Sequence, residues 1–192
     1  MRLEQALAGA IASIRESTAP APTSVAGIVD LFGGGKQGNS ALAVELSGTT
    51  DKSSKAYKAA LRNVERYNAP AGRQQRTPNA ATQERLAKAA ERKINADALA
   101  KIKAKGITVH LAGRVIVSPS GTRPDERERD ISGVYIAPED VAPMVDELAG
   151  RHMNAAADEF NAAFFDAYGM GFAIISNVDT LDIGLGDGDG DL

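Results

Sequence analysis

Hydrophobic residues recur every three or four positions between residues 2 and 105, which is the spacing of amphipathic helices. Ser24 is expected to cap the second of these helices, and Asn39 or Ser40 the third, because Ser and Asn side chains satisfy free backbone N–H groups at helix starts. Residues 97–105 are predicted to form either a further helix or a continuation of the helix over residues 80–94. The pattern predicts helices over residues 2–16, 25–32, 41–46, 51–67 and 80–94.

From Ile107 the period changes to two, which indicates half-buried strands. Strands are expected over residues 107–117, with a bulge at Gly113, over 130–137, and from 172 to 178 or on to 183. Residues 118–129 are predicted to be a polar loop. Helices are expected over residues 138–149 and 154–168.

These elements predict an α+β fold in two parts: a helical helix-turn-helix part, followed by a small three-stranded sheet with two helices. Residues 1–23 are expected to form an N-terminal helix and a linker. A basic DNA-binding part is predicted over residues 24–105 and an acidic α/β interaction part over 106–183. The acidic tail, residues 184–192, is predicted to be disordered.

The charge distribution supports this division. The chain has a net charge of −3, but residues 51–114 carry 15 Lys and Arg against 5 Asp and Glu. Residues 125–192 carry 3 Lys and Arg against 16 Asp and Glu. A cationic segment attracts polyanions such as nucleic acid. The alternative is that the two halves of the chain simply pair with each other.

Several classes of chemistry are excluded by composition. The chain has no Cys, hence no disulfide and no thiolate zinc site, which fits a cytoplasmic location. No segment is long and apolar enough for a signal peptide or a membrane span, so no membrane partner is expected. Only two His are present and no carboxylate spacing stands out. We therefore expect no metal and no cofactor, and no catalytic residue is assigned.

The most specific pattern is a helix, a turn at Gly48 and a longer helix over residues 51–67. A helix-turn-helix protein places the second helix in the DNA major groove, with its N-terminal residues at the base edges. Ser53, Ser54, Lys55 and Lys58 are therefore the candidates for base contact. The alternative is an ordinary solvated amphipathic helix.

The segment after this helix, RQQRTP at residues 73–78, resembles an arm that follows a phosphate backbone or enters a minor groove. The alternative is a charged surface loop. The next helix would extend a phosphate-binding stripe. The predicted nucleic-acid contacts are Lys52, Ser53, Ser54, Lys55, Lys58, Arg62, Arg66, Arg73, Arg76, Arg85 and Lys88.

A family resemblance follows from short motifs: NVERY at residues 63–67, the RQQRTP arm, and the basic helix ATQERLAKAAERK at 81–93. With a strand beginning GITV and a final acidic strand NVDTLDI, the chain resembles the terminal proteins of actinobacterial linear chromosomes and plasmids over residues 40–183. The resemblance implies binding to replicon ends, with a side-chain hydroxyl that primes DNA synthesis. No local motif assigns that role to one of the hydroxyls in the corresponding region, Thr108, Ser118, Ser120 and Thr122.

The leading hypothesis is a double-stranded DNA-binding protein of a plasmid, phage or linear-replicon maintenance system. A phage or shell assembly protein with a non-specific basic segment is the first alternative, and a protein primer for DNA replication is the second. The acidic part is expected to form a homodimer or larger homo-oligomer. The alternative is that the acidic part imitates DNA and binds the basic part of the same chain.

Overall fold

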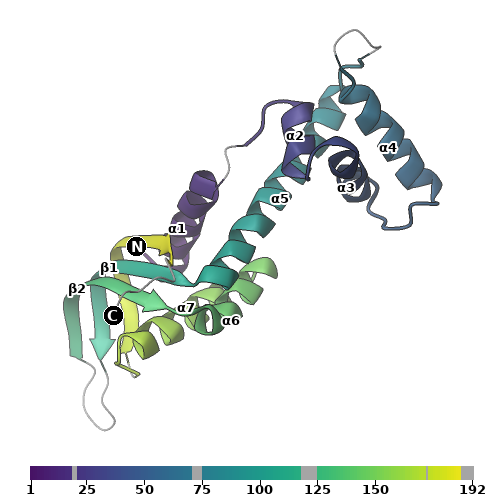
Figure 1. The fold of residues 1–192 in the computed structure, drawn as a ribbon. Helices are drawn as coiled ribbons and strands as arrows, with labels where there is room; N and C mark the ends of the chain where they lie inside the picture. Colours follow the sequence, from purple (N-terminus) through teal and green to yellow (C-terminus); the bar gives the residue numbers. More distant parts are fainter. Residues whose placement is uncertain (19–20, 71–74, 118–124, 172, 187–192) are drawn as a thin grey trace. The chain divides into compact units, whose positions relative to one another are not determined.

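Two compact units make up the chain, whose computed structural model describes all residues except 19–20, 71–74, 118–124, 172 and 187–192 (Figure 1). Unit 1 consists of Met1–Thr18 and Ala96–Leu192, and unit 2 of Ala19–Asn95. The described residues form seven helices and a three-stranded antiparallel sheet, which confirms the predicted α+β fold. The division falls within helix α5 (Ala80–Lys105), not at its end at residue 105.

The sheet of unit 1 consists of β1 (Ile107–Val117), β2 (Asp125–Ile136) and β3 (Ala173–Leu185), in the order β2-β1-β3. Alternate residues of β1 are buried, as the period of two predicts. The register between β1 and β3 shifts between Ala112 and Gly113, in agreement with the expected bulge. A Cβ atom at Gly113 would lie 2.2 Å from the Asn177 carbonyl oxygen, so only glycine permits this close approach.

The core of unit 1 joins the inward residues of the sheet to α6 (Pro138–Ala149) and α7 (Met153–Ala167). Phe160 and Phe164 are fully buried within it. Helix α1 (Leu3–Thr18) packs against β3 and α7, and the Val178 N–H donates to the Met1 carbonyl oxygen at 2.9 Å. The N-terminal helix, which the sequence analysis set apart, therefore belongs to this core. Its buried residues are Ala6, Leu7, Ala10, Ile11 and Ile14.

Unit 2 consists of α2 (Val25–Leu31), α3 (Gly35–Ser47), α4 (Lys55–Tyr67) and the first part of α5. The predicted cap of α2 is confirmed, because the Ser24 hydroxyl accepts a hydrogen bond from the Gly27 N–H at 3.1 Å. Each helix contributes to one small core. Its buried residues are Ile28, Val29, Leu42, Val64, Leu86, Ala89 and Ala90.

The start of α3 corrects the prediction. The helix begins at Gly35 and not at residue 41, and Asn39 and Ser40 lie inside it. Their side chains bind α4 and its C-cap: Ser40 Oγ lies 2.9 Å from Tyr57 Oη, and Asn39 Oδ1 accepts from Asn68 Nδ2 at 3.1 Å. Contacts with α4 therefore outweigh the local capping preference of these two residues.

Two further boundaries differ from the sequence pattern, and for residues 97–105 the structure has the continuation, one of the two predicted alternatives. Helix α4 begins at Lys55 rather than at residue 51, because Ser54 forms its cap. Strand β2 begins at Asp125 rather than at residue 130, because pairing with β1 extends into the polar stretch. Helix α5 runs without interruption to Lys105 and ends where Gly106 adopts a positive φ of 70°. None of the helices in the described ranges has the length and apolarity to cross a membrane.

Candidate nucleic-acid interface

A row of four basic side chains runs along the outer side of α4. Lys55, Lys58, Arg62 and Arg66 are spaced three, four and four residues apart, which puts them on one side of a helix. All four are exposed. The buried residues of α4, Tyr57 and Val64, occupy the opposite side and anchor the helix to unit 2.

Within the described part of the chain, none of these four side chains forms an ion pair or a hydrogen bond. Lys and Arg side chains on a helix surface commonly pair with acids one turn away. Here Glu65 is the acid within α4, and it forms no such pair with a described residue. The four positive charges are therefore available to a partner.

The segment after α4 returns to the end of the helix. The Arg76 N–H donates to the Arg66 carbonyl oxygen at 3.2 Å, and Gln75 Nε2 donates to the Tyr67 carbonyl oxygen at 3.2 Å. Arg76 is exposed, and its backbone is bound to the last turn of α4, whereas an arm that follows DNA was predicted. Arg73 and Gln74 lie outside the described residues. We refer to Lys55, Lys58, Arg62, Arg66 and Arg76 together as the cationic surface.

The two serines predicted to contact bases are used inside unit 2. Ser54 is the N-cap of α4, and its hydroxyl accepts from the Tyr57 N–H at 3.1 Å. The Ser53 hydroxyl donates to Asp51 Oδ1 at 2.7 Å, and its backbone N–H donates to the same oxygen at 2.8 Å. These hydrogen bonds, that of the side chain first, hold the pKa of Asp51 below its ordinary value. Asp51 is therefore a carboxylate at neutral pH. Lys52, which is exposed, lies between these residues.

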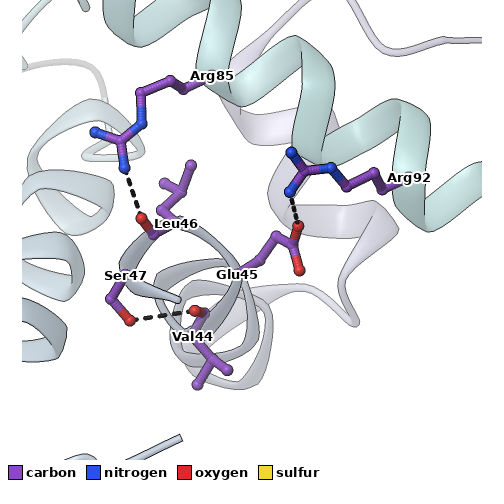
Figure 2. A network of polar contacts seen from close by, with 6 residues as sticks. All are labelled: Val44, Glu45, Leu46, Ser47, Arg85 and Arg92. Carbon is purple, nitrogen blue, oxygen red and sulfur yellow. Dashed lines mark hydrogen bonds and ion pairs between the residues drawn. The ribbon is translucent and has the colours of Figure 1, made fainter. Parts of the chain in front are cut away.

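Two arginines of α5 hold α3 in position (Figure 2). Arg85 Nη2 donates to the Leu46 carbonyl oxygen at 2.6 Å, and Arg92 Nη1 lies 2.8 Å from Glu45 Oε1. A guanidinium at the C-terminal end of a helix satisfies a free carbonyl and the helix dipole. Lys88 pairs with Glu84 at 2.6 Å, and this hydrogen bond lowers the pKa of Glu84. Arg85 and Lys88 thus have partners within unit 2, unlike the residues of the cationic surface.

The connection between α3 and α4 is longer than the three or four residues of a typical helix-turn-helix motif. Gly48 ends α3 in the left-handed conformation, with φ 67°. The chain then continues through residues 49–54 before α4 begins. The predicted turn at Gly48 is therefore the C-cap of α3 and only the first residue of the connection.

Ser54→Ala is expected to lower the free energy of unfolding of unit 2 by about 1 kcal/mol, because the N–H at Tyr57 loses its acceptor. Hydrogen exchange of the α4 amides measures this loss. Ser53→Ala, which leaves the cap intact, is the control and should have a smaller effect. Unchanged exchange in Ser54→Ala together with weaker DNA binding would show instead that this hydroxyl contacts DNA.

Among its described residues, unit 1 brings together no comparable set of functional groups. Thr108 lies half-buried in β1, whereas Ser118, Ser120 and Thr122 fall outside the described residues. His110 is exposed, opposite Asp182 of β3. A search of the described residues finds no cluster of three or more His, Asp or Glu that could hold a metal ion. The priming role implied by the resemblance therefore stays a prediction.

Strand β2 lies at an edge of the sheet, where a second copy of the chain could pair with it. In a two-fold symmetric antiparallel pair centred on Arg127, this residue would face its own copy and Glu126 would face Glu128. A pair centred on Glu128 would bring Glu128 opposite itself and Arg127 opposite Arg129. Like charges directly opposite each other destabilise a sheet. Self-association through the charged stretch of β2 is therefore disfavoured in these two registers.

Comparison with known proteins adds no assignment to this geometry. No family model, no curated protein and no solved structure matches the chain. The resemblance to terminal proteins is thus neither supported nor opposed by them.

Proposed function

We propose that unit 2 binds double-stranded DNA through the cationic surface. The observation that carries this proposal is the row of exposed Lys and Arg on α4, extended by Arg76, without acidic partners among the described residues. Neutralising phosphates releases condensed counterions from DNA, and this release supplies affinity that does not depend on sequence.

The charge of each unit supports the same assignment. Unit 2 carries 12 Lys and Arg against 6 Asp and Glu, whereas unit 1 carries 10 against 19. A polyanion is attracted to the first and repelled by the second. Unit 1 then serves another purpose, for which we propose self-association.

Duplex DNA fits the surface better than single strands do. Proteins that bind single strands stack the bases on exposed aromatic side chains. In unit 2, Tyr57 is buried, and Phe32 and Tyr67 are half-buried. Among the described residues, the cationic surface therefore offers charge without a stacking platform.

The biological process is proposed on the sequence motifs alone. Maintenance of a plasmid, phage or linear replicon is our proposal, with a terminal-protein-like role at replicon ends. Assembly of a phage or shell and protein priming of replication are the alternatives. DNA binding in unit 2 is compatible with all three, so the experiment below tests binding itself.

The test measures the affinity of the full chain for a fluorescently labelled 20-base-pair duplex over a range of salt concentrations. Lys58→Ala combined with Arg62→Ala removes the two central charges of the row. We expect the affinity to fall at least tenfold, because each substitution removes about one phosphate contact. For the same reason, the slope of log K against log salt should flatten by about 2.

Lys101→Ala combined with Lys105→Ala is the matched control, because both residues are exposed on the part of α5 that belongs to unit 1. This pair removes the same charge and should leave the affinity nearly unchanged. Equal losses in the two double variants would mean that only the total charge matters. Equally tight binding of a single strand of the same length would argue against a duplex-binding surface.

A further inference from the structure

We infer that the cationic surface binds the phosphates of duplex DNA and does not distinguish base sequences. The inference rests on the DNA binding proposed above and adds which part of the DNA is contacted. It differs from the helix-turn-helix prediction, in which Ser53, Ser54, Lys55 and Lys58 contact bases.

The polar groups near the start of α4 already have partners within unit 2. Ser54 caps the helix and Ser53 binds Asp51 through both its hydroxyl and its backbone N–H. Each hydroxyl keeps part of its hydrogen-bonding capacity, but its orientation is set by the bond that it makes within unit 2. The amides of Asn68 and Gln75, at the other end of α4, are likewise bound to Asn39 and to the Tyr67 carbonyl.

A carboxylate precedes the N-terminal end of α4. A recognition helix inserts its N-terminal end into the major groove, between two phosphate strands. In this chain the Asp51 carboxylate precedes that end, and its hydrogen bonds with Ser53 favour the ionised form. Insertion of this end would bring a negative charge close to the phosphates. The carboxylate by itself disfavours insertion of this end, and the exposed Lys52 and Lys55 beside it carry the opposite charge.

The row of basic side chains is nearly as long as α4 itself. From Lys55 to Arg66 the helix rises by about 16 Å, so the charges extend over the whole of α4 rather than one end. Arg76 continues the row beyond the helix. Asn63, the amide within α4 that remains to contact adenine, lies about 60° or more around the helix from each Lys and Arg of the row. A helix that lies lengthwise on the backbone uses all five charges at once.

Substitution of Arg by Lys distinguishes phosphate binding from base recognition. Arg contacts guanine through two parallel hydrogen bonds that Lys does not reproduce in the same geometry, whereas either residue neutralises a phosphate. We expect Arg62→Lys combined with Arg66→Lys to change the affinity of the full chain for duplex DNA by less than about threefold. Arg62→Ala combined with Arg66→Ala should weaken it at least tenfold.

The decisive measurement is selection of bound duplexes from a random-sequence library by the full wild-type chain. We expect the selected pool to show no enriched motif and to bind as the starting pool does, with the same salt dependence. An enriched motif that the Lys variant no longer selects would overturn the inference and leave DNA binding intact. If no duplex is retained even at low salt, both the inference and the proposed function are wrong.

Discussion

Phe164→Ala is expected to lower the free energy of unfolding of unit 1 by about 4 kcal/mol. The Phe164 side chain is fully buried, and its ring lies between three aromatic neighbours. The ring centroids are 5.9 Å from Phe160, 5.1 Å from Phe165 and 6.3 Å from Tyr168. Truncation removes the transfer energy of the ring and leaves a cavity that the helices fill only in part. Urea unfolding followed by circular dichroism measures the loss.

Tyr168→Ala is the matched control, because it removes an aromatic ring one turn further along that is 42% exposed. Its loss should be about 1 kcal/mol, since much of this ring already contacts water. The two variants also separate the units. Phe164 belongs to the core of unit 1, and the core of unit 2 is a different set of residues. Complete loss of DNA binding by Phe164→Ala under conditions in which unit 2 remains folded would contradict the assignment of binding to unit 2.

Gly38→Ala is expected to destabilise unit 2 by about 3 kcal/mol, which is near the upper end of overpacking effects. The Cβ atom of an alanine at this position would lie 2.2 Å from the Val29 carbonyl oxygen and 2.9 Å from Val29 Cγ1. The carbonyl belongs to the backbone of α2, so relief requires that α2 and α3 move apart. The core between them would then open. Hydrogen exchange of the α3 and α4 amides should rise, and DNA affinity should fall with it.

Gly9→Ala is the same chemical change as Gly38→Ala, but we expect it to have the opposite effect on stability. Gly9 is exposed in α1, and a Cβ atom there would meet no atom within 4 Å. Alanine favours the helix by about 0.5 to 1 kcal/mol over glycine, so this variant should be slightly more stable than the wild type. If Gly38→Ala were also neutral or stabilising, the close contact between α2 and α3 would not be present in solution.

Local contacts explain which boundaries could be predicted. Helix α6 begins at Pro138 as expected, because Pro at the first position and the acids Glu139 and Asp140 act within one turn. Strand β3 extends past the end of the longer predicted range, because its pairing with β1 continues to Leu185. The start of α3 could not be predicted in the same way. Glycine disfavours helices locally, and the contact that keeps Gly38 in α3 comes from Val29 of another helix.

In the candidate site, too, features that depend on local sequence could be predicted, and those that depend on distant contacts could not. The outward position of Lys55, Lys58, Arg62 and Arg66 follows from helical periodicity, and the structure finds all four exposed. The return of Arg76 to the end of α4 depends on a hydrogen bond across ten residues of sequence. The use of Ser54 as a cap could have been predicted, because it precedes the basic run of α4 and Ser is a preferred N-cap.

The sequence by itself determined the kind and order of the helices and strands, the separation of charge along the chain, and the side of α4 that faces solvent. Periodicity and composition are local properties, and they suffice for these features. Tertiary structure alone decided that α1 joins the core of unit 1, that α3 lies against the backbone of α2, and that Arg85 is occupied at the end of α3. Each of these depends on a contact between residues far apart in sequence, and no pattern within one segment specifies the partner.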